Sequence, residues 1–224
     1  MSAFDKYIAA GEVAEPLDDT HAILQRKDCY RFGSDAVALA KFAGEYVRRE
    51  QRVFDLCSGC GVVGILMAIE YGVSVVGAEL DHTLCDMSVR SAAMNGLENA
   101  AFYNADIRDG GSEPFASGRG MFDAVTCNPP FYKTGSVPRL VYPQAASELT
   151  VTFDDVAARA AELLKVGGAF CLVHTSSRLD EVLCTCREHG LAPKNLKINE
   201  NGKTFLLRAV KGGRAGMVVS VGKF

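Results

Sequence analysis

A four-residue segment that could hold a planar nitrogen group follows the hydrophobic run 122–127. It reads Asn128-Pro129-Pro130-Phe131. The two prolines fix φ and lack an N–H, so the backbone is stiff there while its carbonyl oxygens can still accept hydrogen bonds. The Asn128 side chain adds another carbonyl acceptor. Two acceptors beside an aromatic ring suit a group with two N–H hydrogens, such as a nucleobase amino group or a side-chain carboxamide. The alternative is a rigid loop with a buried phenylalanine.

A glycine-rich segment, Asp55-Leu-Cys-Ser-Gly59-Cys-Gly61-Val-Val-Gly64, is a second candidate site. Glycines let the backbone approach a ligand, and the N-terminus of a following helix is electropositive. Gly59, Gly61 and Gly64 match G-x-G-x-x-G, and Glu79 lies 20 residues after Gly59. This spacing fits the dinucleotide-binding fingerprint, so a nicotinamide-dependent oxidoreductase competes with other nucleotide-binding functions.

Strands and helices are predicted to alternate along the chain. Hydrophobic runs predict strands at 52–55, 73–79, 101–105, 122–127 and 169–174. Apolar periodicity and capping residues predict helices at about 34–47, 62–71, 81–95, 153–165 and 177–189. A hairpin is expected around Gly202, between 195–199 and 204–210, whereas residues 1–20 are expected to form a loose lead-in and 23–25 a short extended segment.

This order predicts an α/β fold with a Rossmann-like, doubly wound, mainly parallel sheet and a C-terminal β-hairpin. Ligands of such sheets bind beyond the carboxyl ends of the strands. The polar residues at those ends are Asp55, Glu79, Asp106 and Asn128.

The composition is that of a globular protein, with 48% hydrophobic and 23% charged residues among 224, which excludes disorder over most of the chain. No apolar run approaches the roughly 20 residues that span a bilayer, and the N-terminus lacks a signal-peptide pattern, so we expect a cytoplasmic protein without a membrane partner. Cys57 and Cys60 form the one C-x-x-C among eight cysteines. Cys184 and Cys186 have the wrong spacing for a second pair of zinc ligands, so we expect no metal.

Positive charge is concentrated at the C-terminal end of the chain. The net charge is −3, yet residues 193–224 carry seven basic residues against one acid, which leaves +6 there and −9 elsewhere. The basic set includes Lys194, Lys197 and Lys211. A stretch of this kind is either a solvated surface or a contact for a phosphate backbone.

The sequence resembles class I S-adenosylmethionine-dependent methyltransferases through D-L-C-S-G-C-G at 55–61 and N-P-P-F at 128–131. It looks still more like the bacterial tRNA adenine-N6 methyltransferases that modify the adenine next to the anticodon of a valine tRNA. Segments 29–37, 128–136, 147–148 and 153–165 carry this closer similarity, which continues at His174, 178–179, 193–194 and 211–213. N-P-P-F is typical of enzymes that methylate a planar nitrogen in any substrate. Tyr-Arg-Phe at 30–32 and Lys-Thr-Gly-Ser at 133–136 narrow the resemblance to the members that act on tRNA.

The resemblance implies a role for each matching residue. The methionine part of the cofactor is expected at Asp55, Ser58, Gly59 and Gly61. Its ribose is expected at Glu79, its adenine ring at Leu80, and the amino edge of that ring at Asp106 and the backbone of Ile107. Arg31 and Phe32 are expected to close the cofactor side, and Asn128, Pro129, Pro130 and Phe131 to hold the target base, with Asn128 also near the cofactor. The sequence departs from the family at Cys57, where glycine is usual, at Ser147, where histidine is common, and in the short stretch after Gly213.

The expected protein is therefore an S-adenosylmethionine-dependent methyltransferase of adenine N6 in tRNA, at a position of the anticodon-loop 37 type. Residues 1–50 are interpreted as a lead-in and cofactor-closing helix, and residues 51–224 as the methyltransferase domain with a basic C-terminal hairpin. Methylation of an amino group in ribosomal RNA or of a protein glutamine amide remains an alternative. A nicotinamide oxidoreductase has no use for N-P-P-F, and a non-catalytic cofactor-binding module would not need it intact.

Overall fold

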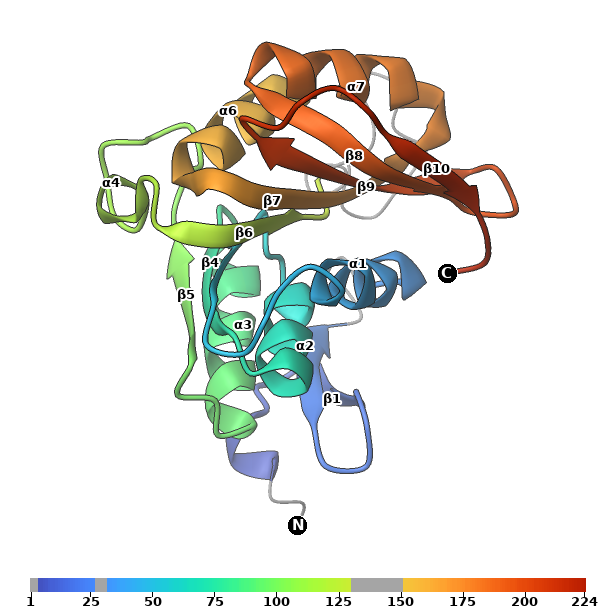
Figure 1. The fold of residues 1–224 in the computed structure, drawn as a ribbon. Coiled ribbons are helices and arrows are strands. Elements are labelled where there is room, and N and C mark those ends of the chain that lie inside the picture. The colour runs from blue at the N-terminus through green and yellow to red at the C-terminus, as the bar shows by residue number, and fades with distance from the viewer. Residues whose placement is uncertain (1–3, 27–31, 130–150) are drawn as a thin grey trace.

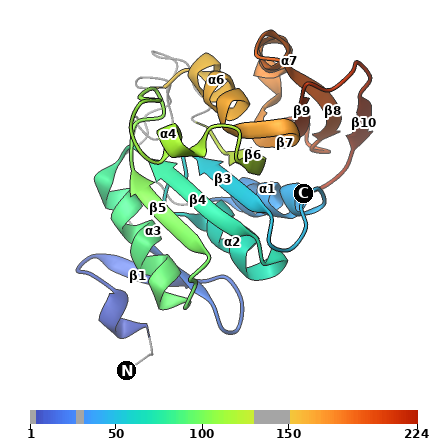
Figure 2. The ribbon, with the colours of Figure 1, turned by 60° about the vertical axis from the view of Figure 1, so that its left-hand side comes forward.

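The computed structural model describes residues 4–26, 32–129 and 151–224. In this part of the chain, eight strands form one central sheet in the order β10-β8-β9-β7-β6-β3-β4-β5 (Figures 1 and 2). Their bounds are β3 (Arg52–Leu56), β4 (Ser74–Glu79), β5 (Ala100–Asn104), β6 (Phe122–Cys127), β7 (Leu164–Thr175), β8 (Leu191–Ile198), β9 (Thr204–Lys211) and β10 (Val218–Val221). Strands β3 to β7 pair in parallel, whereas β9 is antiparallel to β7 and β8. The predicted mainly parallel sheet with a C-terminal hairpin is confirmed.

Helices cover both faces of the sheet, as a doubly wound fold requires. One face packs against α1 (Ser34–Gly44), α2 (Val62–Tyr71) and α3 (His82–Met94). The other packs against α4 (Phe115–Gly118), α6 (Phe153–Leu163) and α7 (Leu179–Glu188), with the 3-10 turn η2 (Ser176–Arg178) before α7. The described residues include no helix that is both long and apolar enough to cross a membrane.

The helix boundaries follow signals that can be read in the sequence. The Asp81 side chain accepts hydrogen bonds from the N–H groups of Thr83 (2.8 Å) and Leu84 (3.1 Å) and caps α3. Gly72, with φ +61°, ends α2 in the left-handed conformation that glycine adopts readily. Capping and chain reversal at these two sites are local, which is why both boundaries were predictable.

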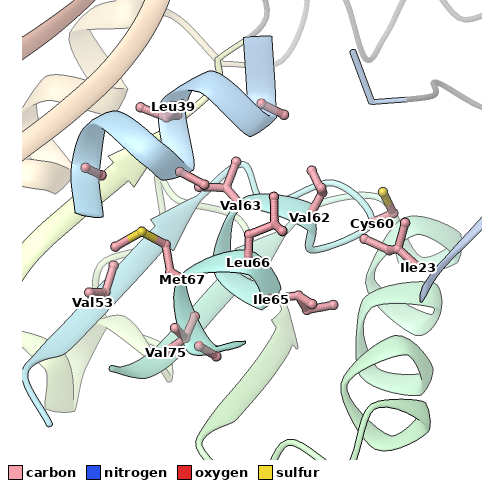
Figure 3. Packing of buried hydrophobic residues seen from close by; sticks show 14 of the residues in the cluster. Ile23, Leu39, Val53, Cys60, Val62, Val63, Ile65, Leu66, Met67 and Val75 are labelled. Atoms are coloured by element: carbon pink, nitrogen blue, oxygen red, sulfur yellow. The ribbon is translucent and has the colours of Figure 1, made fainter. Parts of the chain in front are cut away.

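Successive side chains of β3 point to opposite faces of the sheet, and the hydrophobic core accordingly forms two clusters. Val53 belongs to the cluster under α1 and α2, whereas Phe54 belongs to the cluster under α4 and α6. Figure 3 shows the first cluster, with Leu39 of α1 near Val63 and Met67 of α2. Because both faces of the central strands β3 and β6 are buried, these strands read as nearly continuous hydrophobic runs, whereas the edge strand β5 is largely exposed.

The N-terminal segment differs from the expected loose lead-in. After the 3-10 turn η1 (Asp5–Tyr7), β1 (Glu12–Pro16) and β2 (Ala22–Arg26) form an antiparallel hairpin. Arg90 of α3 holds this hairpin, since its Nη1 and Nη2 each donate to a Glu12 carboxylate oxygen at 2.7 Å. The Leu24 N–H also donates to Ser91 Oγ at 2.9 Å. These partners lie far away in sequence, so the local pattern of residues 1–20 gave no sign of them.

The C-terminal half differs from the prediction at two boundaries and by one additional strand. Helix α6 ends at Leu163, two residues early, because Leu164 already pairs with Phe122 of β6 and Lys165 Nζ binds Asp123 Oδ1 at 2.7 Å. Strand β8 begins at Leu191 and continues past Pro193, where its register against β9 shifts. Strand β10 was not predicted; it pairs in parallel with β8.

Candidate active site

A cavity of about 880 Å³, counting the space at its mouth, opens at the carboxyl ends of β3, β4 and β6. Strands β4 and β6 lie on opposite sides of β3, so this is the point where the strand order reverses and where open α/β sheets bind ligands. The cavity is lined by Phe32, Ala36, Asp55, Cys57, Ser58, Gly59, Cys60, Val62, Val63, Ala78, Glu79, Leu80, Leu84, Ala105, Ile107, Asn128 and Val151.

The three glycines of the turn have different roles. Gly59 has φ +56° and lines the cavity, and a Cβ built on it would meet nothing within 4 Å. A Cβ on Gly61 would lie 2.7 Å from Ser88 Cβ, and one on Gly64 would lie 2.8 Å from Val75 Cγ1. Gly61 is not among the lining residues. Gly59 therefore leaves room for a ligand, whereas Gly61 and Gly64 allow close packing of α2.

Asp55 is a buried carboxyl group at the end of β3. Its Oδ1 accepts from Thr126 Oγ1 (2.7 Å) and its Oδ2 from the Gly64 N–H (3.1 Å). Burial raises the pKa of Asp55 to about 7, and the two hydrogen bonds only partly oppose this rise. A cation in the cavity would favour the ionised form.

Glu79 is held in place by backbone amides. Its Oε2 accepts from the Gly59 N–H (2.8 Å) and its Oε1 from the Asp81 N–H (2.9 Å). Burial raises the pKa of Glu79. Each carboxylate oxygen keeps a further lone pair, so Glu79 can accept hydrogen bonds from two hydroxyl groups of a ligand.

Ser58 and Leu80 complete this side of the cavity. Ser58 Oγ is buried and has no hydrogen-bond partner within the described part of the chain. Leu80 is an apolar side chain with 42% exposure. A buried polar atom without a partner is costly, so a ligand that bonds Ser58 Oγ would remove a penalty. Leu80 offers an apolar surface to a ring.

The expected pair Asp106 and Ile107 is only partly at the cavity. Ile107 lines it, and its carbonyl oxygen accepts from Arg159 Nε at 2.6 Å. Asp106 is not a lining residue, and Arg108 Nη2 binds its Oδ2 at 2.5 Å. This hydrogen bond lowers the pKa of Asp106.

The expected base-binding segment begins at the same cavity. Asn128 directly follows β6 and lines the cavity. Pro129 is buried and is not a lining residue. Arg31, Pro130 and Phe131 lie outside the described residues. Phe32, which was expected to close the cofactor side, lines the cavity.

Cys57 adopts a backbone conformation that explains why glycine is usual at this position in the family it resembles. Its φ is +53°, in the left-handed region that residues with a Cβ rarely adopt. Burial and the neighbouring Cys57 thiol raise the pKa of Cys127. Cys60 is buried and accepts from Gln25 Nε2 at 3.7 Å. Within the described residues, no group of three or more His, Cys, Asp or Glu side chains could hold a metal.

Sequence reasoning missed the apolar walls of the cavity. Ala36, Val62, Val63, Ala78, Leu84, Ala105 and Val151 line it. In the sequence these residues are indistinguishable from core residues, because helix and strand periodicity identifies a buried face but not what lies against it.

Two of the three expected RNA-contact lysines bind backbone carbonyl groups. Lys194 Nζ donates to the Arg214 carbonyl at 2.5 Å, and Lys211 Nζ donates to the Leu164 carbonyl at 2.8 Å. Lys197 Nζ lies 5.8 Å from the centre of the Phe224 ring.

Comparisons with known proteins agree with the fold. A tRNA1(Val) (adenine(37)-N6)-methyltransferase from Porphyromonas gingivalis is 28% identical over 157 residues, or 68% of this chain and 61% of that protein. A release factor glutamine methyltransferase from Bifidobacterium longum is 25% identical over 70% of this chain and 59% of that protein. A solved structure described as a predicted O-methyltransferase from Agrobacterium tumefaciens has the same fold, with a TM-score of 0.64 and 20% identity over 85% of this chain and 86% of that one.

The chain spans about three fifths of the length of the curated relatives it matches. The model of the methyltransferase small domain matches residues 36–183, which run from the wall of the cavity in α1 to α7. Because this match covers more than half of the sequence, the chain belongs to the methyltransferase small domain family.

Proposed function

We propose that the protein is an S-adenosylmethionine-dependent methyltransferase that modifies N6 of an adenine in tRNA, at a position of the anticodon-loop 37 type. The observation that carries this proposal is that Asn128 lines the same cavity as Asp55 and Glu79. Asn128 can accept a hydrogen bond from an amino group of the substrate. The carboxylates of Asp55 and Glu79, in the same cavity, suit a ligand that carries a positive charge and hydroxyl groups. The names of several relatives support tRNA adenine as the substrate.

The donor set of the cavity fits S-adenosylmethionine. Glu79 would accept hydrogen bonds from the two ribose hydroxyls, and Leu80 would pack on the adenine ring. The open space at Gly59 and the unpartnered hydroxyl of Ser58 suit the methionine part, beside Asp55. Gly61 would act by shaping this turn. Arg31 and Phe32 would close the cofactor side.

The amino edge of the cofactor ring remains assigned to Asp106 and the backbone of Ile107. For Asp106, only the lone pairs that Arg108 leaves available can serve this purpose. For Ile107, the N–H is the group to consider, since the carbonyl oxygen already binds Arg159.

The target base is assigned to Asn128, Pro129, Pro130 and Phe131. When bound, the cofactor supplies a methyl group activated by its sulfonium sulfur. The Asn128 side-chain carbonyl and the Pro129 carbonyl would accept the two hydrogens of the adenine amino group and direct its lone pair toward the methyl carbon. The bound cofactor would supply the methyl group and be left as a neutral thioether, and the amino nitrogen would give up its extra proton to water. The residues thus act by alignment, a major source of rate enhancement when two reactants must meet.

The proposal extends to partners and domain organisation. The basic C-terminal surface, which includes Lys194, Lys197 and Lys211, would contact tRNA. Residues 1–50 would close the cofactor side, supported by Phe32 and Ala36 at the cavity wall, and residues 51–224 would form the methyltransferase domain. A cytoplasmic location follows from a tRNA substrate.

The first test is transfer of labelled methyl groups to unmodified bulk tRNA, ribosomal RNA and cell protein, followed by nucleoside analysis. We expect N6-methyladenosine in tRNA and a loss of at least about 100-fold with Asn128→Ala, the order of magnitude for removing a group that stabilises the transition state. S-adenosylhomocysteine binding to Asn128→Ala should stay near the wild-type value. Label in guanosine or protein would overturn the tRNA-adenine assignment, and normal turnover of Asn128→Ala would overturn the role of Asn128.

A further inference from the structure

A groove lies between α1 and the C-terminal part of the sheet; we call it the α1 groove. One wall is a stripe of α1 with helical spacing, and the other comes from β8, β9 and the C-terminus. It contains about 830 Å³, counting the space at its mouth. Figures 1 and 2 show the C-terminus beside α1. The lining residues are Ser34, Val37, Ala38, Lys41, Phe42, Glu45, Lys197, Leu206, Lys223 and Phe224.

Three lysines give this groove a positive charge. Lys41 comes from α1, Lys197 from β8 and Lys223 from the C-terminal residues. Within the described residues, none of the three Nζ atoms makes a hydrogen bond or an ion pair, in contrast to Lys194 and Lys211. Glu45 is the single acid of the lining, and it lies just beyond the last residue of α1.

Aromatic side chains lie between these charges. Phe224 is half-buried against the core and lines the groove, and Lys197 lies above its ring. Phe42 of α1 is almost fully buried at the opposite wall. Proteins that bind single-stranded nucleic acids without reading their sequence combine two features: basic side chains that contact the phosphates and aromatic rings on which the bases stack.

The α1 groove begins close to the cavity. Ala36 lines the cavity, whereas Ser34 and Val37, on either side of it, line the groove. With 3.6 residues per turn, Ala36 lies on the side of α1 opposite the stripe formed by Ser34, Val37 and Lys41, so the first turns of the helix separate the two spaces. A strand with one base in the cavity would pass around this part of α1 to reach the groove.

We propose that the α1 groove binds the single-stranded nucleotides next to the target adenine, with phosphates at Lys41, Lys197 and Lys223 and a base stacked on Phe224. This inference rests on the proposed function and identifies the path of the RNA. It makes the groove lysines the principal phosphate contacts and leaves Lys194 and Lys211, whose ammonium groups also bind backbone carbonyls, as secondary ones.

The test compares two triple variants that lose the same charge. Lys41→Gln, Lys197→Gln and Lys223→Gln are combined in one, and Lys6→Gln, Arg119→Gln and Arg187→Gln, at exposed residues outside both the groove and the basic C-terminal surface, are combined in the other. An anticodon stem-loop RNA is titrated between about 50 and 200 mM salt. Each lost phosphate contact on a single strand reduces the magnitude of the slope of log K against log salt by about 0.7. The three substitutions in the groove variant should therefore reduce the magnitude of this slope by about 2. The control variant should keep nearly the wild-type slope.

Phe224 is tested separately. Phe224→Ala should weaken RNA binding about 10-fold without changing the salt slope, because stacking is not a charge effect. Phe224→Tyr should restore it. Binding of S-adenosylhomocysteine, which does not use the groove, reports whether each variant is folded.

The outcomes separate the two proposals. If wild-type protein methylates RNA but the groove variant binds it normally, or the control variant loses as much affinity, the groove assignment is wrong and the proposed function stands. If wild-type protein neither binds nor methylates RNA, both are wrong. Saturable, salt-dependent binding of an acidic peptide in place of RNA, lost in the groove variant, would assign the groove to a protein partner and overturn the inference.

Discussion

The cofactor side of the cavity and the α1 groove offer opposite physical means of binding. In the cavity, Asp55 and Glu79 are buried or half-buried, and backbone N–H groups hold their carboxylates at fixed positions. In the groove, Lys41 and Lys223 are exposed and none of the lysines is held by a hydrogen bond within the described residues. The first arrangement selects one small ligand by geometry, whereas the second attracts any nearby phosphates by charge. Salt should therefore affect RNA binding strongly and cofactor binding weakly.

The largest effect on the cofactor side is expected at Glu79. Glu79→Ala should weaken S-adenosylmethionine binding about 100-fold or more, because hydrogen bonds to a charged group are worth about 1.5–3 kcal/mol each and two are proposed. Calorimetric titration measures the change. Glu98→Ala, which removes an exposed carboxylate elsewhere, is the matched control and should leave affinity unchanged. Affinity of Glu79→Ala within threefold of wild type would contradict the proposed ribose contact.

A smaller effect is expected from pH, through Asp55. Its pKa is raised to about 7 in the free protein, so at pH 6 most of this carboxyl group is protonated. The cationic cofactor favours the ionised form, so its affinity should rise as pH increases, by about 10-fold between pH 6 and 8 for a pKa near 7. Asp55→Asn should flatten this dependence and thereby separate Asp55 from Glu79. A wild-type affinity that is constant over this range would contradict the prediction.

The same carboxyl group should also affect stability, with a definite sign. Because the folded-state pKa of Asp55 lies above the unfolded value of 3.8, the folded protein binds this proton more tightly. The contribution of Asp55 to stability is therefore most favourable below about pH 4 and declines as pH rises toward 7. Denaturant unfolding of wild type and Asp55→Asn at several pH values isolates this contribution, because the variant lacks the titrating group.

The parts of the site that the sequence predicted share one property: their signals are local. Asp55, Glu79 and Asn128 each end a hydrophobic strand, and the parallel fold brings those ends to one edge of the sheet. The Asp81 cap was equally visible, because the groups it bonds follow within three residues. Helix caps are thus predictable from neighbouring residues alone. The meeting of the strand ends is predictable once the strand order is that of a doubly wound sheet.

Features that depend on distant partners were not predictable. The hairpin β1–β2 is held by Arg90, which is 78 residues from Glu12. The α1 groove combines Lys41 with Lys197 and Lys223, and nothing near any one of them in the sequence indicates the other two. The engagement of Lys194 and Lys211 by backbone carbonyls is likewise visible only in the folded chain, so charge counting alone could not distinguish them from the lysines of the groove.

The smallest effect concerns Cys57, where a departure from the family pattern meets an unfavourable backbone conformation. A residue with a Cβ at φ +53° is strained, and relief of such strain is worth about 1 kcal/mol. Cys57→Gly should therefore be more stable than Cys57→Ala by about that amount, since both lack the thiol that neighbours Cys127 and differ only in the Cβ. Urea denaturation of the two variants measures the difference. Cofactor affinity should change little in either, because the contacts proposed for Glu79 and Ser58 remain. Equal stabilities would mean that the turn relaxes when the thiol is removed. The hydrogen bond from the Gly59 N–H to Glu79 would then fix the cofactor loop less firmly than its length of 2.8 Å indicates.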